Sequence, residues 1–156
     1  MFLSSKPKIS IVVIFYNMQR EAARTLFSLS ERYQRGVSGN DWEVIAIDNG
    51  STEPISEKFV KSFGSQFRYY YYKTKSVSPA SAVNFGVSLS KSNRVSICID
   101  GARMASPGII KHTLQAFKAF KKRFPDMWRC AWGGFRPVES ESEGNNCQFC
   151  QPGPKN

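Results

Sequence analysis

Apolar residues along this chain follow two spacings that alternate. Short apolar or aromatic runs predict strands, and the first two of these runs predict buried strands, the first of them rich in β-branched residues and covered on both faces. These runs span residues 8–15, 42–47, 67–72 and 95–99. After each run, apolar residues recur every three or four positions, which predicts a helix. The predicted helices span 19–33, 57–63, 79–91 and 107–124. Because strand and helix alternate, we expect an α/β domain with a mostly parallel sheet and helices on both faces.

The pattern stops near residue 123. Residues 136–156 contain Pro, Gly and a Ser/Glu run with almost no periodic apolar signal, which predicts a loosely structured tail. We therefore expect one folded domain over residues 1–122 and a tail over residues 123–156. The abrupt change would also suit a truncated or frameshifted reading frame.

The net charge of the chain indicates which classes of binding partner to expect. The chain has a net charge of +10, and residues 1–122 hold all of it because acids and bases balance over 123–156. Such an excess favours nucleic acid, acidic lipid headgroups or a phosphorylated small molecule. The longest apolar run, Ile11 to Tyr16, is too short to cross a bilayer, and no secretory signal is visible. We therefore expect a cytoplasmic protein.

Three predicted strands end in polar residues. Tyr16 and Asn17 follow the first strand, Asp48 closes the second, and Asp100 closes the fourth. Ligands of parallel α/β sheets bind at the carboxyl ends of strands. Two carboxylates there can accept hydrogen bonds from a sugar or base, or hold a divalent cation that neutralises a pyrophosphate. The alternative is that Asp48 and Asp100 only cap the segments that follow them.

Several common motifs are absent. The chain has no G-x-G-x-x-G after the first strand, no G-x-x-x-x-G-K-[ST] and no G-x-S-x-G. Rossmann-type dinucleotide binding, P-loop nucleotide hydrolysis and an α/β-hydrolase triad therefore find no support. The only histidine, His112, falls within a predicted helix among lysines, which favours a solvated side chain.

Four segments together resemble family 2 glycosyltransferases, which have the Rossmann-like GT-A fold. Residues 8–17 (KISIVVIFYN) are similar to the family's first strand and Tyr-Asn turn. Residues 42–52 (WEVIAIDNGST) are similar to its second strand and Asp-Asp/Asn-Gly-Ser-Thr turn. Residues 78–86 (SPASAVNFG) resemble its small-residue helix, and Asp100 falls where its Asp-x-Asp begins.

The resemblance implies a nucleotide-activated sugar as donor and transfer with inversion to an acceptor that the sequence does not name. It places Tyr16 against the base and Asp48 as an acceptor of a hydrogen bond from that base. Asn84 lies in the segment that lines the nucleotide site. Asp100 would lie near the ribose or near a divalent cation, Mn²⁺ or Mg²⁺, on the diphosphate.

The chain departs from the family at two points. Ala102 stands where a second Asp is expected, which weakens the metal site, and Arg103 could supply a fixed cation to the diphosphate instead. The family's acceptor half, which carries the catalytic base, is replaced by the tail, so that half is expected to be missing. Downstream glutamates occur only in the solvated run 139–143, so the catalytic residues stay unassigned. A non-catalytic, truncated GT-A fragment is therefore the alternative to an active enzyme.

Two other functions remain as alternatives. Residues 68–73 (RYYYYK) interleave aromatic and basic side chains, as single-stranded nucleic acid binding requires, but the run also fits a covered strand. The predicted helix at 107–124 carries apolar residues opposite lysines, which would allow peripheral contact with an anionic membrane. The simpler interpretation is that this apolar stripe packs on the sheet.

Overall fold

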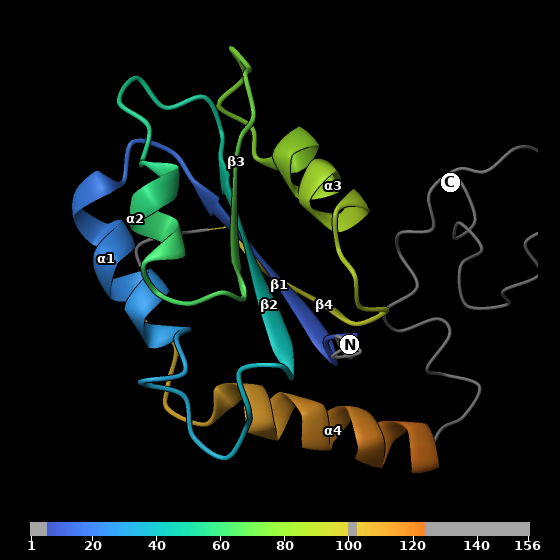
Figure 1. The fold of residues 1–156 in the computed structure, drawn as a ribbon. Helices are drawn as coiled ribbons and strands as arrows, with labels where there is room; N and C mark the ends of the chain where they lie inside the picture. The colour runs from blue at the N-terminus through green and yellow to red at the C-terminus, as the bar shows by residue number, and fades with distance from the viewer. Residues whose placement is uncertain (1–5, 100–102, 124–156) are drawn as a thin grey trace, which may run out of the picture. The chain divides into compact units, whose positions relative to one another are not determined.

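The computed structural model describes residues 6–99 and 103–123. A first compact unit ends at Leu114. Its sheet has four parallel strands in the order β3-β2-β1-β4 (Figure 1). The strands are β1 (Ile9–Phe15), β2 (Trp42–Asp48), β3 (Phe67–Tyr71) and β4 (Val95–Cys98). The helices are α1 (Gln19–Ser28), α2 (Glu57–Lys61), α3 (Ala80–Ser88) and α4 (Ile109–Arg123). The predicted order of elements and the parallel sheet are confirmed.

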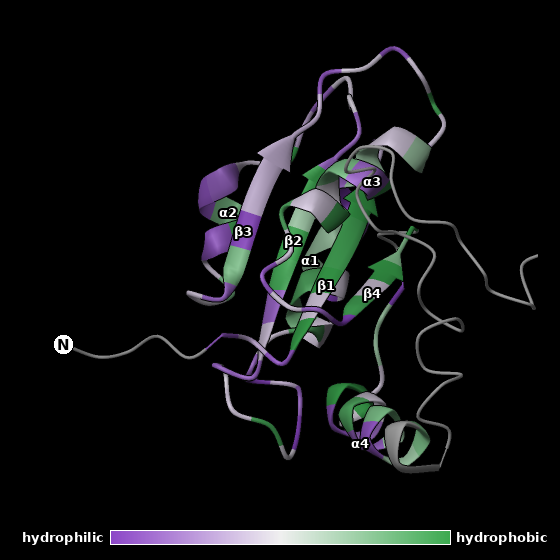
Figure 2. Ribbon diagram, turned by 90° about the vertical axis from the view of Figure 1, so that its right-hand side faces the viewer, coloured by the Kyte–Doolittle hydropathy of each residue, from purple (hydrophilic) through white to green (hydrophobic). Residues whose placement is uncertain are grey.

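Helices cover both faces of the sheet. Helices α1 and α2 lie side by side on one face, and α3 lies on the other (Figures 1 and 2). All seven residues of β1 and all seven of β2 are buried for this reason. Strands covered on both faces lack the apolar–polar alternation of half-exposed strands, which explains the continuous apolar runs in the sequence. The hydropathy colouring of Figure 2 shows these two strands as largely apolar.

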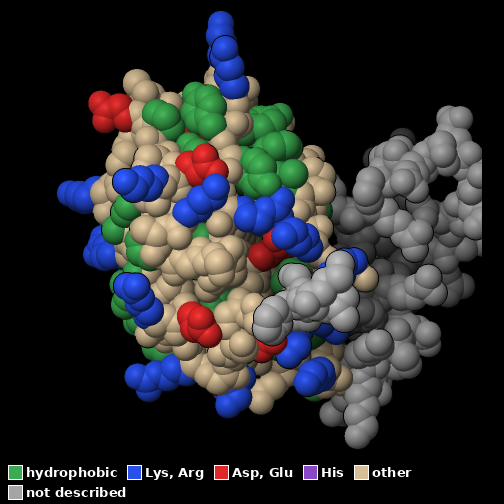
Figure 3. Space-filling model, viewed as in Figure 1, with side chains coloured by type: hydrophobic (Ala, Val, Ile, Leu, Met, Phe, Trp, Pro, Cys, Tyr) green, Lys and Arg blue, Asp and Glu red, His purple; other side chains and the backbone are tan. Residues whose placement is uncertain are grey.

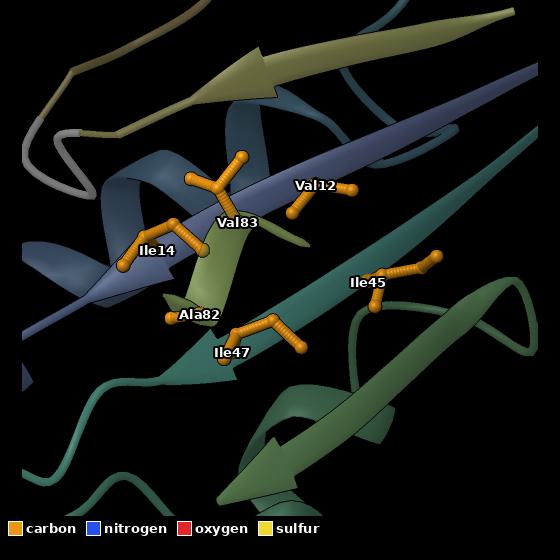
Figure 4. Close-up of a cluster of buried hydrophobic side chains, with 6 residues drawn as sticks. All are labelled: Val12, Ile14, Ile45, Ile47, Ala82 and Val83. Carbon is orange, nitrogen blue, oxygen red and sulfur yellow. The ribbon is translucent and has the colours of Figure 1, made fainter. Parts of the chain in front are cut away.

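The core beneath α3 joins the helix to the two central strands. Val12 and Ile14 of β1 lie beside Ile45 and Ile47 of β2, and α3 places Ala82 and Val83 against them (Figure 4). Tyr70, Tyr72 and Phe85 pack at the border of this cluster. Two of the tyrosines in the aromatic run are therefore partly buried against α3, which favours the covered-strand interpretation of that run over a nucleic-acid surface.

Helix α1 is shorter than the sequence predicts. The apolar spacing predicts a helix to residue 33, but α1 ends at Ser28. The carbonyl groups at this end accept hydrogen bonds from side chains. The Ser28 hydroxyl donates to Thr25 O and the Ser30 hydroxyl to Phe27 O, each at 2.7 Å. The Trp42 indole donates to Leu29 O at 3.0 Å. Side chains that hydrogen-bond to backbone groups compete with helix continuation, and the later apolar residues belong to a turn.

Strand β4 and helix α4 are each only partly covered. Strand β4 is a sheet edge among the described residues, and Ile97 is 44% exposed. In α4, Ile110 is buried, whereas Phe120 is 57% exposed, so the predicted apolar stripe is not covered along its length. Among residues 6–99 and 103–123, no helix is both long and apolar enough to cross a membrane. The predicted tail from residue 124 onward lies outside the described residues.

We predict that Gly86→Ala destabilises the fold. A Cβ at Gly86 would overlap Val12 Cγ1 and lie 3.4 Å from Ile47 Cγ1. Ala normally stabilises a helix relative to Gly by about 1 kcal/mol, but overpacking a core costs about 1–3 kcal/mol. Urea unfolding should therefore show a net loss of stability. Ser88→Ala, at an exposed position of the same helix, is the control, and a gain in stability for Gly86→Ala would contradict the close contact.

Candidate functional site

Three loops meet at the carboxyl end of the sheet, at the top of Figure 1. They connect β1 to α1, β2 to α2 and β3 to α3, over residues 16–18, 49–56 and 72–79. The strand order reverses at β1, because β2 pairs with one side of it and β4 with the other. Ligands of open α/β sheets bind outside the carboxyl ends at such a reversal. The β1–α1 and β2–α2 loops are therefore the candidate binding site.

Asn17 joins the first two loops. Its backbone has a φ of 51°, in the left-handed region that Asn tolerates better than most residues. In this conformation its N–H donates to Ser51 Oγ at 2.8 Å, and its Oδ1 accepts from the Thr52 N–H at 2.9 Å. The Asn49 N–H donates to Phe15 O at 2.8 Å, which extends the strand pairing into the loops. The two loops therefore form one hydrogen-bonded unit.

Asp48 organises the loop that follows it. Its carboxylate is only 1% exposed, with Oδ1 accepting from the Ser51 N–H at 2.8 Å and Oδ2 from the Ile55 N–H at 3.3 Å. The first bond reaches the backbone N–H three residues ahead, so the carboxylate caps the turn that follows the strand. The capping role that the sequence left open is therefore present. Contact between Asp48 and a base stays a prediction.

Asn49 ties the third loop to the other two. It is 2% exposed, and its Nδ2 donates to Ser78 O at 3.3 Å and Ser76 O at 3.5 Å. Its Oδ1 is buried and has no donor among the described residues, so it is an acceptor that a ligand could satisfy. Gly50 has a φ of 75°, and a Cβ there would lie 2.6 Å from Thr74 O. Glycine is needed at this position for both reasons.

The other predicted site residues lie on three different segments: Tyr16 in the β1–α1 loop, Asn84 in α3 and Arg103 in the segment after β4. Tyr16 is 40% exposed beside the joined loops, as a residue that contacts a ligand must be. Asn84 is exposed on α3, on the side opposite the buried Ala82 and Val83, and within the described residues no hydrogen bond joins it to the loops. Arg103 is exposed and lines a cavity of about 240 Å³ with Ile97. The roles of all three residues stay predictions.

The predicted metal position lies at Asp100 and Ala102, outside the described residues. Within residues 6–99 and 103–123, no group of three or more His, Cys, Asp or Glu side chains could hold a metal ion. The expectation of Mn²⁺ or Mg²⁺ therefore rests on the resemblance alone.

A buried polar cluster that sequence reasoning missed lies at the opposite end of the sheet. Glu43 is 4% exposed, and its carboxylate accepts from Ser10 Oγ and the Lys91 N–H, both at 2.7 Å, and from Arg68 Nη1 at 3.0 Å. Burial lowers the pKa of Arg68, but its hydrogen bonds to Glu43 and Tyr70 outweigh this effect, so the pKa is raised overall. The sequence feature that could have revealed this cluster is the presence of Ser10 and Glu43 within the otherwise apolar strands β1 and β2.

Tyr69, on β3, also has a shifted pKa. It pairs with Ala46 on β2 and is half-buried. Burial, followed by the charges of Asp48, Tyr71 and Glu57, raises the pKa of Tyr69 to about 12. A tyrosinate at this position would be both desolvated and repelled, which keeps the phenol neutral well above neutral pH.

We predict that Tyr69 makes folding sensitive to alkali. The folded chain holds the phenol proton more tightly than the unfolded chain, whose tyrosine pKa is near 10. This contribution to stability is therefore complete below pH of about 10 and is lost as the pH rises toward the folded pKa of about 12. Tyrosinate absorbance should show a late component that Tyr69→Phe removes and Tyr71→Phe retains. A titration unchanged by Tyr69→Phe would contradict the shift.

We also predict that Asp48→Ala destabilises the β2–α2 loop. It leaves the N–H groups of Ser51 and Ile55 without their acceptor, at about 1–3 kcal/mol each. Asp48→Asn keeps one side-chain oxygen and should lose less in urea unfolding. Glu53→Ala, at an exposed carboxylate of the same loop, is the control. Equal and small losses for all three variants would show that the carboxylate does not hold the loop.

Comparisons with known proteins identify the family and a similar fold. The sequence model of glycosyl transferase family 2 matches residues 10–134. Crystal structures of Staphylococcus aureus TarS have a similar fold. TarS 1–349 aligns with a TM-score of 0.58 and 22% identity, over 74% of this chain and 32% of TarS 1–349. A longer TarS structure gives a TM-score of 0.61 and 20% identity, over 74% of this chain and 20% of its own.

A third structure is TarS 1–349 in complex with UDP-GlcNAc, with a TM-score of 0.58 and 22% identity over 74% of this chain and 31% of its own. The present chain thus spans a fifth to a third of the length of these structures. No curated protein matches the sequence significantly. Because the family match extends over most of the sequence, from the second residue of β1 through α4, the chain belongs to glycosyl transferase family 2.

Proposed function

We propose that this chain binds the nucleotide diphosphate of an activated sugar over the β1–α1 and β2–α2 loops. The observation that carries the proposal is the joining of these two loops by Asn17, with Tyr16 exposed beside them. An exposed aromatic ring at a rigid polar turn suits stacking against a base. The TarS structure with UDP-GlcNAc supports a nucleotide-sugar as the ligand class.

The reaction we propose for the whole transferase is sugar transfer with inversion. The acceptor hydroxyl oxygen attacks the anomeric carbon as the bond from that carbon to the diphosphate oxygen breaks. A general base takes the hydroxyl proton, and the nucleoside diphosphate leaves with the electron pair. Neither the base nor the acceptor is assigned to residues of this chain, so binding without turnover is the alternative outcome for the chain by itself.

The second part of the proposal concerns how the negative charge of the diphosphate is neutralised. Asp100 would hold the divalent cation, and Arg103 would compensate in part for the alanine at position 102. The basic side chains spread over the face seen in Figure 3, with fewer acidic ones among them, favour an anionic ligand in general. The cytoplasmic location and peripheral membrane contact expected from the sequence remain predictions alongside it.

Isothermal titration with UDP and GDP, with and without Mn²⁺, tests the proposal. Tyr16→Ala should weaken binding by about 1–3 kcal/mol through lost stacking. Phe27→Ala is the matched control, because Phe27 is 39% exposed on α1 and Tyr16 is 40% exposed. Asp48→Asn should weaken binding to the base with less loss of stability than Asp48→Ala. Asp100→Ala should remove any enhancement by Mn²⁺.

Two results would overturn the proposal. One is an absence of binding to either nucleotide by a chain that unfolds cooperatively. The other is an equal loss of affinity in Tyr16→Ala and Phe27→Ala, which would place the binding site away from the β1–α1 loop.

A further inference from the structure

A second cavity lies at the amino end of the sheet, opposite the candidate nucleotide site. Its volume is about 490 Å³, within the range of about 300–1,000 Å³ that is usual for small-molecule sites. The residues that line it include Lys6, Asn40, Glu43, Gln66, Arg68 and Lys91. The seven residues of β1 separate the two ends by about 20 Å at about 3.3 Å per residue, so the cavity cannot be part of the nucleotide site.

The charges around this cavity do not balance. Among the described residues that line it, three side chains are basic and only Glu43 is a carboxylate. Arg68 forms an ion pair with that carboxylate, with Nη1 3.0 Å from Oε2, and also donates to Leu89 O at 2.9 Å. These contacts hold the two side chains in place at one side of the cavity. Among the residues that the structure describes, the ammonium groups of Lys6 and Lys91 form no ion pair. An excess of two positive charges is left.

Neutral donors line the same cavity. The Nε2 of Gln66 is buried and has no acceptor within the described ranges. A buried donor without an acceptor costs about 1–3 kcal/mol, which an incoming oxygen would recover. Asn40 and Ser65 add an exposed amide and an exposed hydroxyl. The cavity therefore combines two uncompensated cations with donors that suit an oxyanion.

We propose that this cavity binds a phosphate-bearing anion. A phosphate monoester carries a charge near −1.5 to −2 at neutral pH and presents three acceptor oxygens, which match the two lysines and the Gln66 amide. Lys6 and Lys91 bind the phosphate oxygens, and Arg68 stays with Glu43. The phosphate belongs either to a soluble molecule or to a lipid headgroup. This site is independent of the proposed nucleotide site, since the two share no residue.

Titration of the isotope-labelled chain with inorganic pyrophosphate at low salt, followed by NMR, tests the proposal. The backbone amide of Lys91 and the side-chain amide of Gln66 should shift with a common affinity. The double variant Lys6→Ala/Lys91→Ala should weaken this binding at least about tenfold, as loss of two charge-assisted contacts implies. The double variant Lys58→Ala/Lys118→Ala removes the same charge from exposed positions elsewhere and should bind as the parent does.

Sedimentation with vesicles identifies the source of the phosphate. Binding to phosphatidylglycerol vesicles but not to phosphatidylcholine vesicles, lost in Lys6→Ala/Lys91→Ala, supports a headgroup. Pyrophosphate binding without vesicle binding supports a soluble anion. The proposal is overturned if neither probe binds, if pyrophosphate shifts only residues of the three loops at the carboxyl end, or if both double variants lose affinity equally. Saturation with UDP should leave the shifts of Lys91 and Gln66 in place.

Discussion

The pairing of β1 with β2 is the constraint on which the rest of the structure depends. The two strands run parallel in register over seven residue pairs, from Ile9 with Trp42 to Phe15 with Asp48. Both strands are fully buried, and a shift of one residue would turn every side chain to the other face. The same register brings Asn17 within hydrogen-bond distance of Ser51 and Thr52. The candidate site is therefore a direct consequence of the core.

The two ends of this strand pair differ in chemistry. At the carboxyl end, backbone amides of the β2–α2 loop surround the buried carboxylate of Asp48, and the exposed ring of Tyr16 is left for a ligand. At the amino end, Glu43 binds Ser10 and Arg68, and Lys6 and Lys91 form no ion pair among the described residues. The buried carboxylates of Asp48 and Glu43 are each satisfied by hydrogen bonds within the protein.

Much of the fold could be predicted from the sequence, because apolar spacing reports burial directly. Strands β1 and β2 were predicted to within one residue at each end, since runs covered on both faces stand out from their surroundings. The predicted end of α1 was wrong, because serine hydroxyls and the Trp42 indole hydrogen-bond to the carbonyls there. The indole belongs to a strand residue 13 positions after Leu29, so spacing within the helix does not reveal its contact. Gly86 allows the close approach of α3 to Val12, a contact between segments that lie far apart in the sequence.

The sequence by itself determined the order of strands and helices, the parallel class of the sheet and the polar residues at the strand ends. These features depend on local spacing and on turn chemistry, which neighbouring residues set. Only the tertiary structure decided that Asp48 is enclosed by its own loop and that Glu43 and Arg68 form a pair. Such contacts depend on which segments, distant in the sequence, meet when the sheet forms. Periodicity along the chain reports local structure and does not show which distant segments will meet.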